Sequence, residues 1–370
     1  MDFIVVGGGI IGLSLAYELV TRGASVTLIE QGQWGGEASQ AAAGMLAPYK
    51  EFKEDGPLFE LGRKSLSLYP EWALQLENET GIEVQLKRGG ILTVAASEAD
   101  IREIQAKYVW QKQAGCNLEW LTGDALHERE PLLSAKLQAG IFSPDEGDVN
   151  NQLLLKALHA ACQRRGVKLL AGHVVTGLIT SGERITGVKT AAGEHNACHT
   201  VLTAGAWAGI MAEWLGYANQ VRPVRGQIAA VSSVGIPLRH VVFGPDGYLV
   251  PKRDGRIILG ATEDEAGYCR EVTAGGISRV LQGVQTIIPS VANAAFLQAW
   301  AGLRPASLDG LPLLGPIPDW AGISMAAGHF RNGILLAPVT AKLMADWLVD
   351  GKGQPLAPFD PGRLRELHTK

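Results

Sequence analysis

The sequence has little charge of either sign and lacks the long runs that mark several protein classes. Charged residues make up 19% of its 370 residues, the formal net charge is −4, and no Lys/Arg-rich run occurs. Nucleic acids attract clustered cationic side chains, so this composition argues against nucleic acid as a main partner. Charge or glycine interrupts the longest apolar stretches, so we expect no stable membrane insertion. The amino-terminal residues already have the pattern of a strand, so we also expect no signal peptide.

Cysteine is scarce, and its spacing argues against the common metal and redox motifs. None of the four cysteines stands in a C-x-x-C pair: Cys116, Cys162, Cys198 and Cys269. This usage predicts free thiols in a reducing cytoplasm. His195 and His199 stand on either side of one cysteine, but an extended chain would separate them by about 13 Å, so we expect no metal site.

The first thirty residues hold the strongest pattern in the chain. The apolar residues 3–6 are followed by a G-x-G-x-x-G motif at residues 7–12, by a helix-like stretch at residues 13–22 and by a second apolar run at residues 25–29. The second run ends in an acid, Glu30. A glycine motif that links a strand to a helix in this way predicts dinucleotide binding.

Each glycine of the motif has a physical role. Gly7 permits the tight turn, Gly9 lets a pyrophosphate approach the backbone, and Gly12 lets the helix pack closely against the strands. The helix N-terminus offers free N–H groups to the phosphates. Glu30 can accept hydrogen bonds from both ribose hydroxyls. A glycine-rich turn without a ligand is the alternative, and the motif does not distinguish FAD from NAD.

Two further stretches favour a flavin. Residues 31–45 are mostly small and include Ser39, so their backbone can lie flat against a planar ring; the start of an alanine- and glycine-rich helix is the alternative. Residues 323–327 predict a strand, and a turn at residues 328–333 leads into a helix at residues 334–350. The N-terminal end of that helix dipole favours negative charge. A reduced flavin is anionic at its N1–C2 oxygen locus and a nicotinamide is not, so we expect FAD.

The order of the predicted elements gives the fold class. Strands alternate with helices at both ends of the chain, whereas residues 221–300 are mostly strand-like and predict an antiparallel sheet. We therefore expect an α/β protein in which a discontinuous, Rossmann-type FAD-binding domain carries an inserted, mainly antiparallel substrate-binding domain. The FAD-binding domain is predicted at residues 1–85, 146–218 and 301–370, and the substrate-binding domain at residues 86–145 and 219–300. The acids at residues 145–148 are expected to be solvated in a turn.

Four motifs resemble the D-amino-acid-oxidase family of flavoproteins, and the likeness extends from residue 3 to about residue 350. They are the glycine-rich start that ends in Glu30, residues 39–46 (SQAAAGML), residues 300–305 (WAGLRP) and residues 328–338 (GHFRNGILLAP). The likeness is greatest to the members that oxidise glycine for the thiazole of thiamine.

The resemblance implies a cofactor, a reaction and an assembly. It implies non-covalent FAD and the oxidation of glycine, sarcosine or D-alanine by hydride transfer to flavin N5. Molecular oxygen would be the acceptor, and the products would be a 2-oxo acid, ammonia and hydrogen peroxide. The family often forms tetramers, so we expect a cytoplasmic homo-oligomer.

The resemblance also implies the site residues. Arg304 matches the family's carboxylate-binding arginine, Arg331 a second arginine at the substrate, and Tyr248 the active-site tyrosine. By position, the following residues would line the FAD: Gly7, Gly9, Ile10, Ile11, Gly12, Glu30, Gln31, Ala38, Ser39, Ala43, Gly44, Met45, Val175, His329, Phe330, Arg331, Asn332, Gly333, Ile334 and Leu335. Glu263 stands where one member of the family has an apolar methionine, which leaves the fine substrate preference open.

Alternatives remain for these residues and for the activity. From the residues alone, Arg304 could form a buried structural ion pair, Tyr248 could be an ordinary strand aromatic, and His329 could be a packed strand-end residue. One alternative is a D-amino-acid or sarcosine dehydrogenase or oxidase of the same family with a different substrate or electron acceptor, such as a membrane quinone. Two others are a flavin domain that trims a carboxymethyl group from transfer-RNA uridine and a flavin-binding protein without turnover. The transfer-RNA activity would need a basic face, and the net charge of −4 argues against one.

Overall fold

The computed structural model describes residues 1–217 and 220–368, and its strands form two large sheets and two small ones. The first large sheet has the strand order β18 (Leu313–Pro316), β19 (Ile323–Ala327), β12 (His199–Leu202), β1 (Phe3–Val6), β2 (Val26–Glu30) and β8 (Lys168–Ala171). The second has the order β17 (Phe296–Ser307), β13 (Val221–Ser232), β16 (Arg256–Gly260), β15 (Gly247–Pro251), β14 (Val241–Gly244), β4 (Ile91–Ala95), β6 (Ala139–Ser143) and β5 (Glu119–Thr122). The small sheets are β11 (Gly193–Asn196), β10 (Arg184–Thr190) and β9 (Val175–Ser181), and the pair β3 (Met45–Leu46) and β7 (Gly147–Asp148).

The helices cover both large sheets. The α-helices in the described residues are α1 (Ile10–Thr21), α2 (Ala38–Ala41), α3 (Pro48–Glu51), α4 (Pro57–Thr80), α5 (Glu98–Gln113), α6 (Gly123–Arg129), α7 (Asn151–Arg164), α8 (Ala208–Glu213), α9 (Ala274–Ile287) and α10 (Gly333–Asp350). Short 3-10 turns are η1 (Gly205–Trp207), η2 (Pro289–Asn293), η3 (Phe330–Asn332), η4 (Gln354–Phe359) and η5 (Pro361–His368). None of the helices in the described ranges has the length and hydropathy to cross a bilayer.

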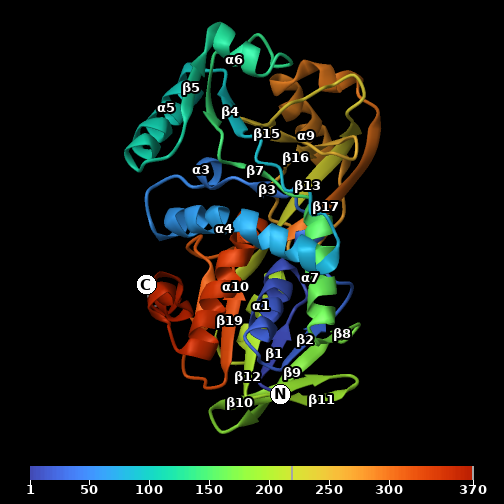
Figure 1. The fold of residues 1–370 in the computed structure, drawn as a ribbon, viewed down its shortest axis with the longest axis vertical. Coiled ribbons are helices and arrows are strands. Elements are labelled where there is room, and N and C mark those ends of the chain that lie inside the picture. The colour runs from blue at the N-terminus through green and yellow to red at the C-terminus, as the bar shows by residue number, and fades with distance from the viewer. Residues whose placement is uncertain (218–219, 369–370) are drawn as a thin grey trace.

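The six-stranded sheet brings together segments that are far apart in the sequence. β1 pairs in parallel with β2 and β12, and the parallel set continues to β19 and β8, while β18 is an antiparallel edge strand. Every residue of β1 and β2 is buried, as expected for parallel strands that helices cover on both faces. Figure 1 shows this sheet with α1, α7 and α10 at one end of the molecule, the eight-stranded sheet at the other, and α4 crossing between them.

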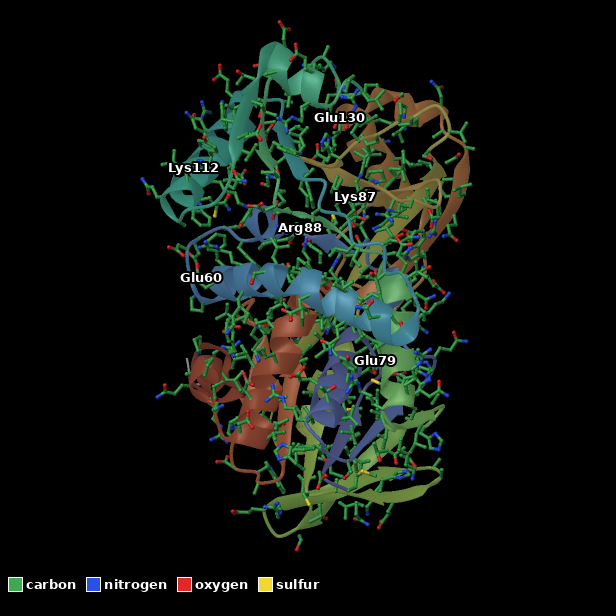
Figure 2. All side chains as sticks on the ribbon, viewed as in Figure 1. Glu60, Glu79, Lys87, Arg88, Lys112 and Glu130 are labelled. Atoms are coloured by element: carbon green, nitrogen blue, oxygen red, sulfur yellow. The ribbon has the colours of Figure 1, made fainter. Side chains whose placement is uncertain are left out.

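Glu79, near the end of α4, joins three helices (Figure 2). Its carboxylate accepts hydrogen bonds from Nε and Nη2 of Arg165 at 2.7 and 2.8 Å, directly after α7. It also accepts a hydrogen bond of 2.7 Å from the hydroxyl of Tyr17 on α1. This network fixes α4, which crosses between the sheets, to α1, which begins in the glycine motif, and to α7, which packs on α1.

The predicted α/β class, with a parallel sheet and a separate, mainly antiparallel sheet, is confirmed. The division into two domains stays a prediction. The predicted boundary between residues 218 and 219 lies outside the described residues, and so do residues 369 and 370 at the end of the predicted FAD-binding domain. Strand β17 runs across the predicted boundary between residues 300 and 301.

Two expectations about local structure are wrong. Residues 274–287, inside the stretch expected to be strand-like, form the helix α9, which begins where the side-chain oxygen of Thr273 accepts a hydrogen bond from the N–H of Gly276. Two of the three acids expected to be solvated are buried instead: Glu146 is 0% exposed and Asp148 is 4% exposed, whereas the side chain of Asp145 is 40% exposed. Glu146 accepts hydrogen bonds from backbone N–H groups of α3, a tertiary contact that local sequence does not indicate.

Candidate active site

Residues of both large sheets line one cavity, which has about 1660 Å³ of empty space, open solvent included. The glycine motif and the turn before α10 line it on one side, and residues of β13, β15 and β17 line it on the other. The cavity therefore extends from the glycine motif to the eight-stranded sheet, so a ligand held at the motif can reach side chains of both sheets.

Nearly all of the predicted site residues line this cavity. Those that do are Gly7, Gly9, Ile10, Ile11, Glu30, Gln31, Ala38, Ser39, Ala43, Gly44, Met45, Val175, Tyr248, Arg304, His329, Phe330, Arg331, Asn332, Gly333 and Ile334. Two do not. Gly12 packs so closely that an added Cβ would lie 1.9 Å from the carbonyl oxygen of Gly7, and Leu335 is 1% exposed in the core behind the cavity.

The first helix N-terminus at the cavity belongs to α1. Gly7 has a φ of +110°, which favours glycine, and an added Cβ there would lie 2.5 Å from the carbonyl oxygen of Thr203. The side-chain oxygen of Ser39 accepts a hydrogen bond of 3.0 Å from the N–H of Ile10. The N-cap residue itself, Gly9, has no side chain with which to cap the helix. The other N–H groups of the first turn therefore remain for a ligand, and their dipole favours an anion.

Glu30 holds the glycine loop in place. One carboxylate oxygen accepts a hydrogen bond of 2.7 Å from the N–H of Gly8, and the other accepts one of 2.7 Å from the N–H of Gly32. Glu30 is 8% exposed and still lines the cavity. Because each carboxylate oxygen can accept more than one hydrogen bond, Glu30 can also accept from ribose hydroxyls.

Residues 38–45 begin with the four-residue helix α2, so a helix does start in this stretch, as the alternative proposed, but it ends after one turn and the chain then extends along the cavity. Asn151 donates from its side-chain nitrogen to the carbonyl oxygen of Ser39 at 2.7 Å. The indole N–H of Trp300 donates to the carbonyl oxygen of Ala41 at 3.1 Å. These donors fix the backbone of a segment that has few side chains of its own to anchor it.

The second helix N-terminus at the cavity belongs to α10. Asn332, its N-cap residue, makes no side-chain cap, so the first N–H groups are again available. Pro338 lacks an N–H, so the carbonyl oxygen of Ile334 has no helical donor, and the hydroxyl of Tyr69 donates to it instead. The long helix α4 thus fixes the first turn of α10.

His329 precedes this turn and is a packed residue at the cavity, and its predicted contact with the flavin stays a prediction. It lines the cavity, yet it is 4% exposed, and its Nε2 lies 3.1 Å from the hydroxyl oxygen of Thr340. Burial lowers the pKa of His329 to about 3, so its imidazole is neutral at physiological pH.

Arg304 and Tyr248 lie over glycines of neighbouring strands. An added Cβ at Gly226 would lie 2.4 Å from Nη2 of Arg304, and one at Gly260 would lie 2.3 Å from the hydroxyl oxygen of Tyr248. Nη1 of Arg304 donates to the carbonyl oxygen of Thr262 at 2.9 Å, and no carboxylate of the described residues pairs with this guanidinium. Burial is the main reason why the pKa of Arg304 is lowered, and burial also raises the pKa of Tyr248.

Arg331 differs from Arg304 because carboxylates surround it. Its Nε and Nη2 lie 2.9 and 3.0 Å from the two carboxylate oxygens of Glu51, and its Nη1 donates to Glu263. Glu51 first, and then Glu263, raise the pKa of Arg331. The predicted contact of Arg331 with a substrate stays a prediction.

Comparison with known proteins places the chain in a family. Residues 2–347 match the family model of the FAD dependent oxidoreductases known as DAO. The chain belongs to this family. The glycine oxidase of Geobacillus kaustophilus is 37% identical over 363 residues, which cover 97% of this chain and 96% of that protein. A crystal structure of glycine oxidase from the same organism superimposes with a TM-score of 0.93 at 35% identity and covers 97% of each chain.

Some relatives in the DAO family are longer than this chain. The bifunctional protein ThiO/ThiG of Trichormus variabilis is 38% identical over 359 residues, which are 96% of this chain and 54% of that protein. The chain therefore spans about half the length of that relative.

The predicted FAD cofactor is confirmed by membership of this FAD-dependent family, and the cavity fits it. Two helices present N-termini at the cavity with N–H groups of the first turn left free, which suits anionic groups. A Cβ added at Gly9 would lie 3.2 Å from the Ser39 oxygen, so the missing side chain keeps the approach to α1 open. Glu30 has acceptor capacity left for a ribose.

Other cavity residues were not expected from the sequence. Glu51 lines the cavity and binds Arg331, but it lies in a stretch without a recognisable motif. Gly226 and Gly260 provide space for the two predicted substrate side chains, and their importance depends on strand register. A glycine directly across the ladder from a large polar residue is a signal that could have found Gly260, but only once the pairing is known.

Proposed function

We propose that this chain catalyses the FAD-dependent oxidative deamination of glycine and of other small amino acids, including sarcosine and D-alanine, with molecular oxygen as the acceptor. The observation that carries the proposal is the guanidinium of Arg304, which lines the cavity with Tyr248. Its one hydrogen bond within the described residues goes to a backbone carbonyl. A half-buried guanidinium without a carboxylate partner in the described residues can pair its charge with an anionic group of the substrate. The similarity to two chains named glycine oxidase supports the substrate class.

The residues of the chain would bind and orient the substrate. Arg304 would hold the α-carboxylate through two parallel hydrogen bonds, and Tyr248 would donate its hydroxyl to the same group. The proposal includes the lining residues of both helix N-termini and Glu30 as the groups that hold FAD. When bound, the flavin supplies the acceptor for the α-hydrogen and passes its electrons to oxygen. For glycine, the balanced reaction consumes water and oxygen and gives glyoxylate, ammonia and hydrogen peroxide.

The acceptor and the biological role belong to the same proposal. Oxygen is preferred over a membrane quinone because relatives of the same length are named oxidases. A role in making the thiazole of thiamine is supported by relatives named ThiO/ThiG, in which a chain similar to this one forms part of a longer protein. The expected cytoplasmic location and the expected homo-oligomer remain part of this proposal.

The test is a substrate panel on the purified, FAD-loaded protein. Glycine, sarcosine, D-alanine, L-alanine and a bulky D-amino acid are supplied in air, without an added acceptor, and hydrogen peroxide is measured. We expect peroxide from the first three substrates. Flavin that glycine reduces without oxygen, but that air then reoxidises slowly, would instead favour a dehydrogenase. Flavin that none of the panel reduces would exclude the proposal.

A further inference from the structure

The three charged side chains Glu51, Arg331 and Glu263 form a cluster, here called the clasp, at the cavity. All three nitrogens of the Arg331 guanidinium lie against carboxylate oxygens. Glu51 and Arg331 line the cavity, and their side chains are 13% and 31% exposed. Glu263 approaches from the loop after β16, and its side chain is 46% exposed.

The clasp carries more negative than positive charge. Two carboxylates face one guanidinium, so the formal charge of the clasp is −1 when all three groups are ionised. The ammonium group of Lys50, beside Glu51 on α3, is outside the clasp but acts on both Glu51 and Arg331, so this excess belongs to the clasp itself and not to its wider surroundings. Arg304 carries a formal charge of +1 without a carboxylate partner in the described residues. The two sites are within electrostatic range, because Arg331, Glu263 and Glu51 all influence the pKa of Arg304, after burial and Tyr248.

This arrangement separates the two arginines by function. Arg304 can receive a carboxylate, because its charge is not balanced. Arg331 cannot receive one without displacing Glu51 or Glu263, because all three nitrogens of its guanidinium already lie against their oxygens, and a carboxylate that comes near would also face the charge of Glu263. Like charges brought together at a partly desolvated site repel strongly, and such repulsion is a common source of specificity.

We infer that the clasp makes the active site reject substrates that carry a second carboxylate, and that Glu263 is the residue that sets this preference. The inference rests on the proposed oxidation of amino acids with Arg304 as the carboxylate site. Glu51 alone would balance the charge of Arg331, so Glu263 supplies the excess. The substrate class is therefore small monocarboxylic amino acids, and N-carboxymethyl amino acids and acidic D-amino acids are excluded.

A purely structural clasp is the competing explanation. In that case Glu51, Arg331 and Glu263 would only tie α3, the turn before α10 and the loop after β16 together. Loss of the Glu263 charge would then weaken all ligands equally or change stability. The charge explanation predicts a selective change, which depends on whether the ligand has one carboxylate or two.

The test uses two inert ligands that differ in one charge. Diglycolate is an ether with two carboxylates, and its monoamide has nearly the same shape but one carboxylate, so neither shape nor turnover separates the pair. Each is titrated into the FAD-loaded protein, and the Kd is taken from the change in flavin absorbance. The quantity of interest is the Kd of diglycolate divided by that of the monoamide.

The variants are Glu263→Gln and a matched control, Glu265→Gln. Glu263→Gln keeps the shape of the side chain and removes its charge. Glu265→Gln removes a charge from the same loop, but Glu265 pairs with Arg222 at an exposed position, and neither residue lines the cavity. Flavin content and thermal unfolding show whether each variant is folded.

We expect a ratio well above one in the unmodified protein, a fall of about tenfold in Glu263→Gln, and no change in Glu265→Gln. A ratio near one in the unmodified protein, an unchanged ratio in Glu263→Gln, or an equal fall in both variants would overturn the inference. Oxidation of glycine by the unmodified protein is measured in parallel. A protein that neither oxidises glycine nor binds the monoamide refutes the proposed function, whereas active protein without charge selectivity refutes only the role of the clasp.

Discussion

The position of Arg304 depends on a residue that has no side chain. Gly226 pairs with Gly302 across the ladder of β13 and β17, and the guanidinium lies over the space that a Cβ at Gly226 would fill. Tyr248 lies in the same way over Gly260, its partner on the neighbouring strand. The two glycines therefore leave the space in which the side chains of Arg304 and Tyr248 lie against the sheet.

Replacement of Arg304 tests the carboxylate site. We expect Arg304→Ala to raise the apparent KM for glycine about 100-fold, because removing one partner of a desolvated charge pair typically costs 2–5 kcal/mol. Bound FAD should be retained, since the helix N-termini that we assign to it are untouched. Arg304→Lys keeps the charge without the planar fork, so its KM for glycine should lie between that of the unmodified protein and that of Arg304→Ala. Steady-state kinetics with flavin absorbance as a control measures both effects, and an unchanged KM would remove Arg304 from the site.

Replacement of Gly226 tests the space beneath the guanidinium. A Cβ there would lie 2.4–2.5 Å from three guanidinium atoms, so Gly226→Ala must displace Arg304. We expect glycine turnover at low substrate to fall about 10- to 100-fold, the scale of a misplacement of about 1 Å. Gly275→Ala in α9 is the control, because no heavy atom lies within 4 Å of its added Cβ. Equal activity of the two variants would show that Arg304 need not lie over Gly226.

At the scale of elements, a buried ion pair supports the segment that extends along the cavity. Nζ of Lys252, just after β15, donates to Asp148 on β7 at 2.7 Å and to the carbonyl oxygen of Val149 at 3.1 Å. The two charged side chains are 7% and 6% exposed. β7 pairs with β3, and a Cβ at Gly44 would lie 3.3 Å from this ammonium group. The pair thus links the eight-stranded sheet to the cavity segment.

Breaking this pair on one side should be costly. We expect Lys252→Met to lower the free energy of unfolding by about 3 kcal/mol, because it leaves the charge of Asp148 buried and unpaired. FAD should also dissociate more readily, because Gly44 and Met45 lose their support. Urea unfolding and flavin release measure the two effects. The double variant Asp148→Asn, Lys252→Met removes both charges and should recover part of the loss; a double variant less stable than Lys252→Met would contradict this account.

At the scale of the whole molecule, one buried acid should make stability depend on pH. Burial raises the pKa of Glu146 from 4.5 to about 8, against the opposing effect of the N–H groups of Tyr49 and Lys50 and of the charge of Lys107. The folded protein therefore holds a proton on Glu146 between about pH 4.5 and 8 that the unfolded chain has lost. Folding stability from this group is fully present below pH 4.5 and is lost as the pH rises through about 8.

We expect the free energy of unfolding to fall with rising pH over this window, by at most about 1.4 kcal/mol per pH unit from this group. Glu146→Gln cannot titrate, so the difference in stability between the variant and the unmodified protein should grow in favour of the variant as the pH rises. Denaturant unfolding at a series of pH values measures this difference. A constant difference across the series would show that Glu146 keeps its ordinary pKa.

Much of the fold follows from short-range patterns. The strand, glycine motif, helix and strand that lead to Glu30 are where the sequence indicates, because hydrophobic periodicity and glycine conformations are local properties. The same holds for the long helix α4 and the strands β13 to β16. The sequence does not indicate helix α9, because three glycines lower its intrinsic helix propensity and its apolar face is stabilised by packing on the eight-stranded sheet.

The sequence by itself determined the α/β class, the family and, through its motifs, many of the residues that line the cavity. Only the tertiary structure decided which of two arginines is free, because Glu51, Glu263 and Arg331 come from three distant segments. It also decided that Glu146 is buried and that glycines lie beneath Arg304 and Tyr248. The physical reason is that charge pairing, burial and strand register are properties of contacts between segments, and no local pattern encodes them.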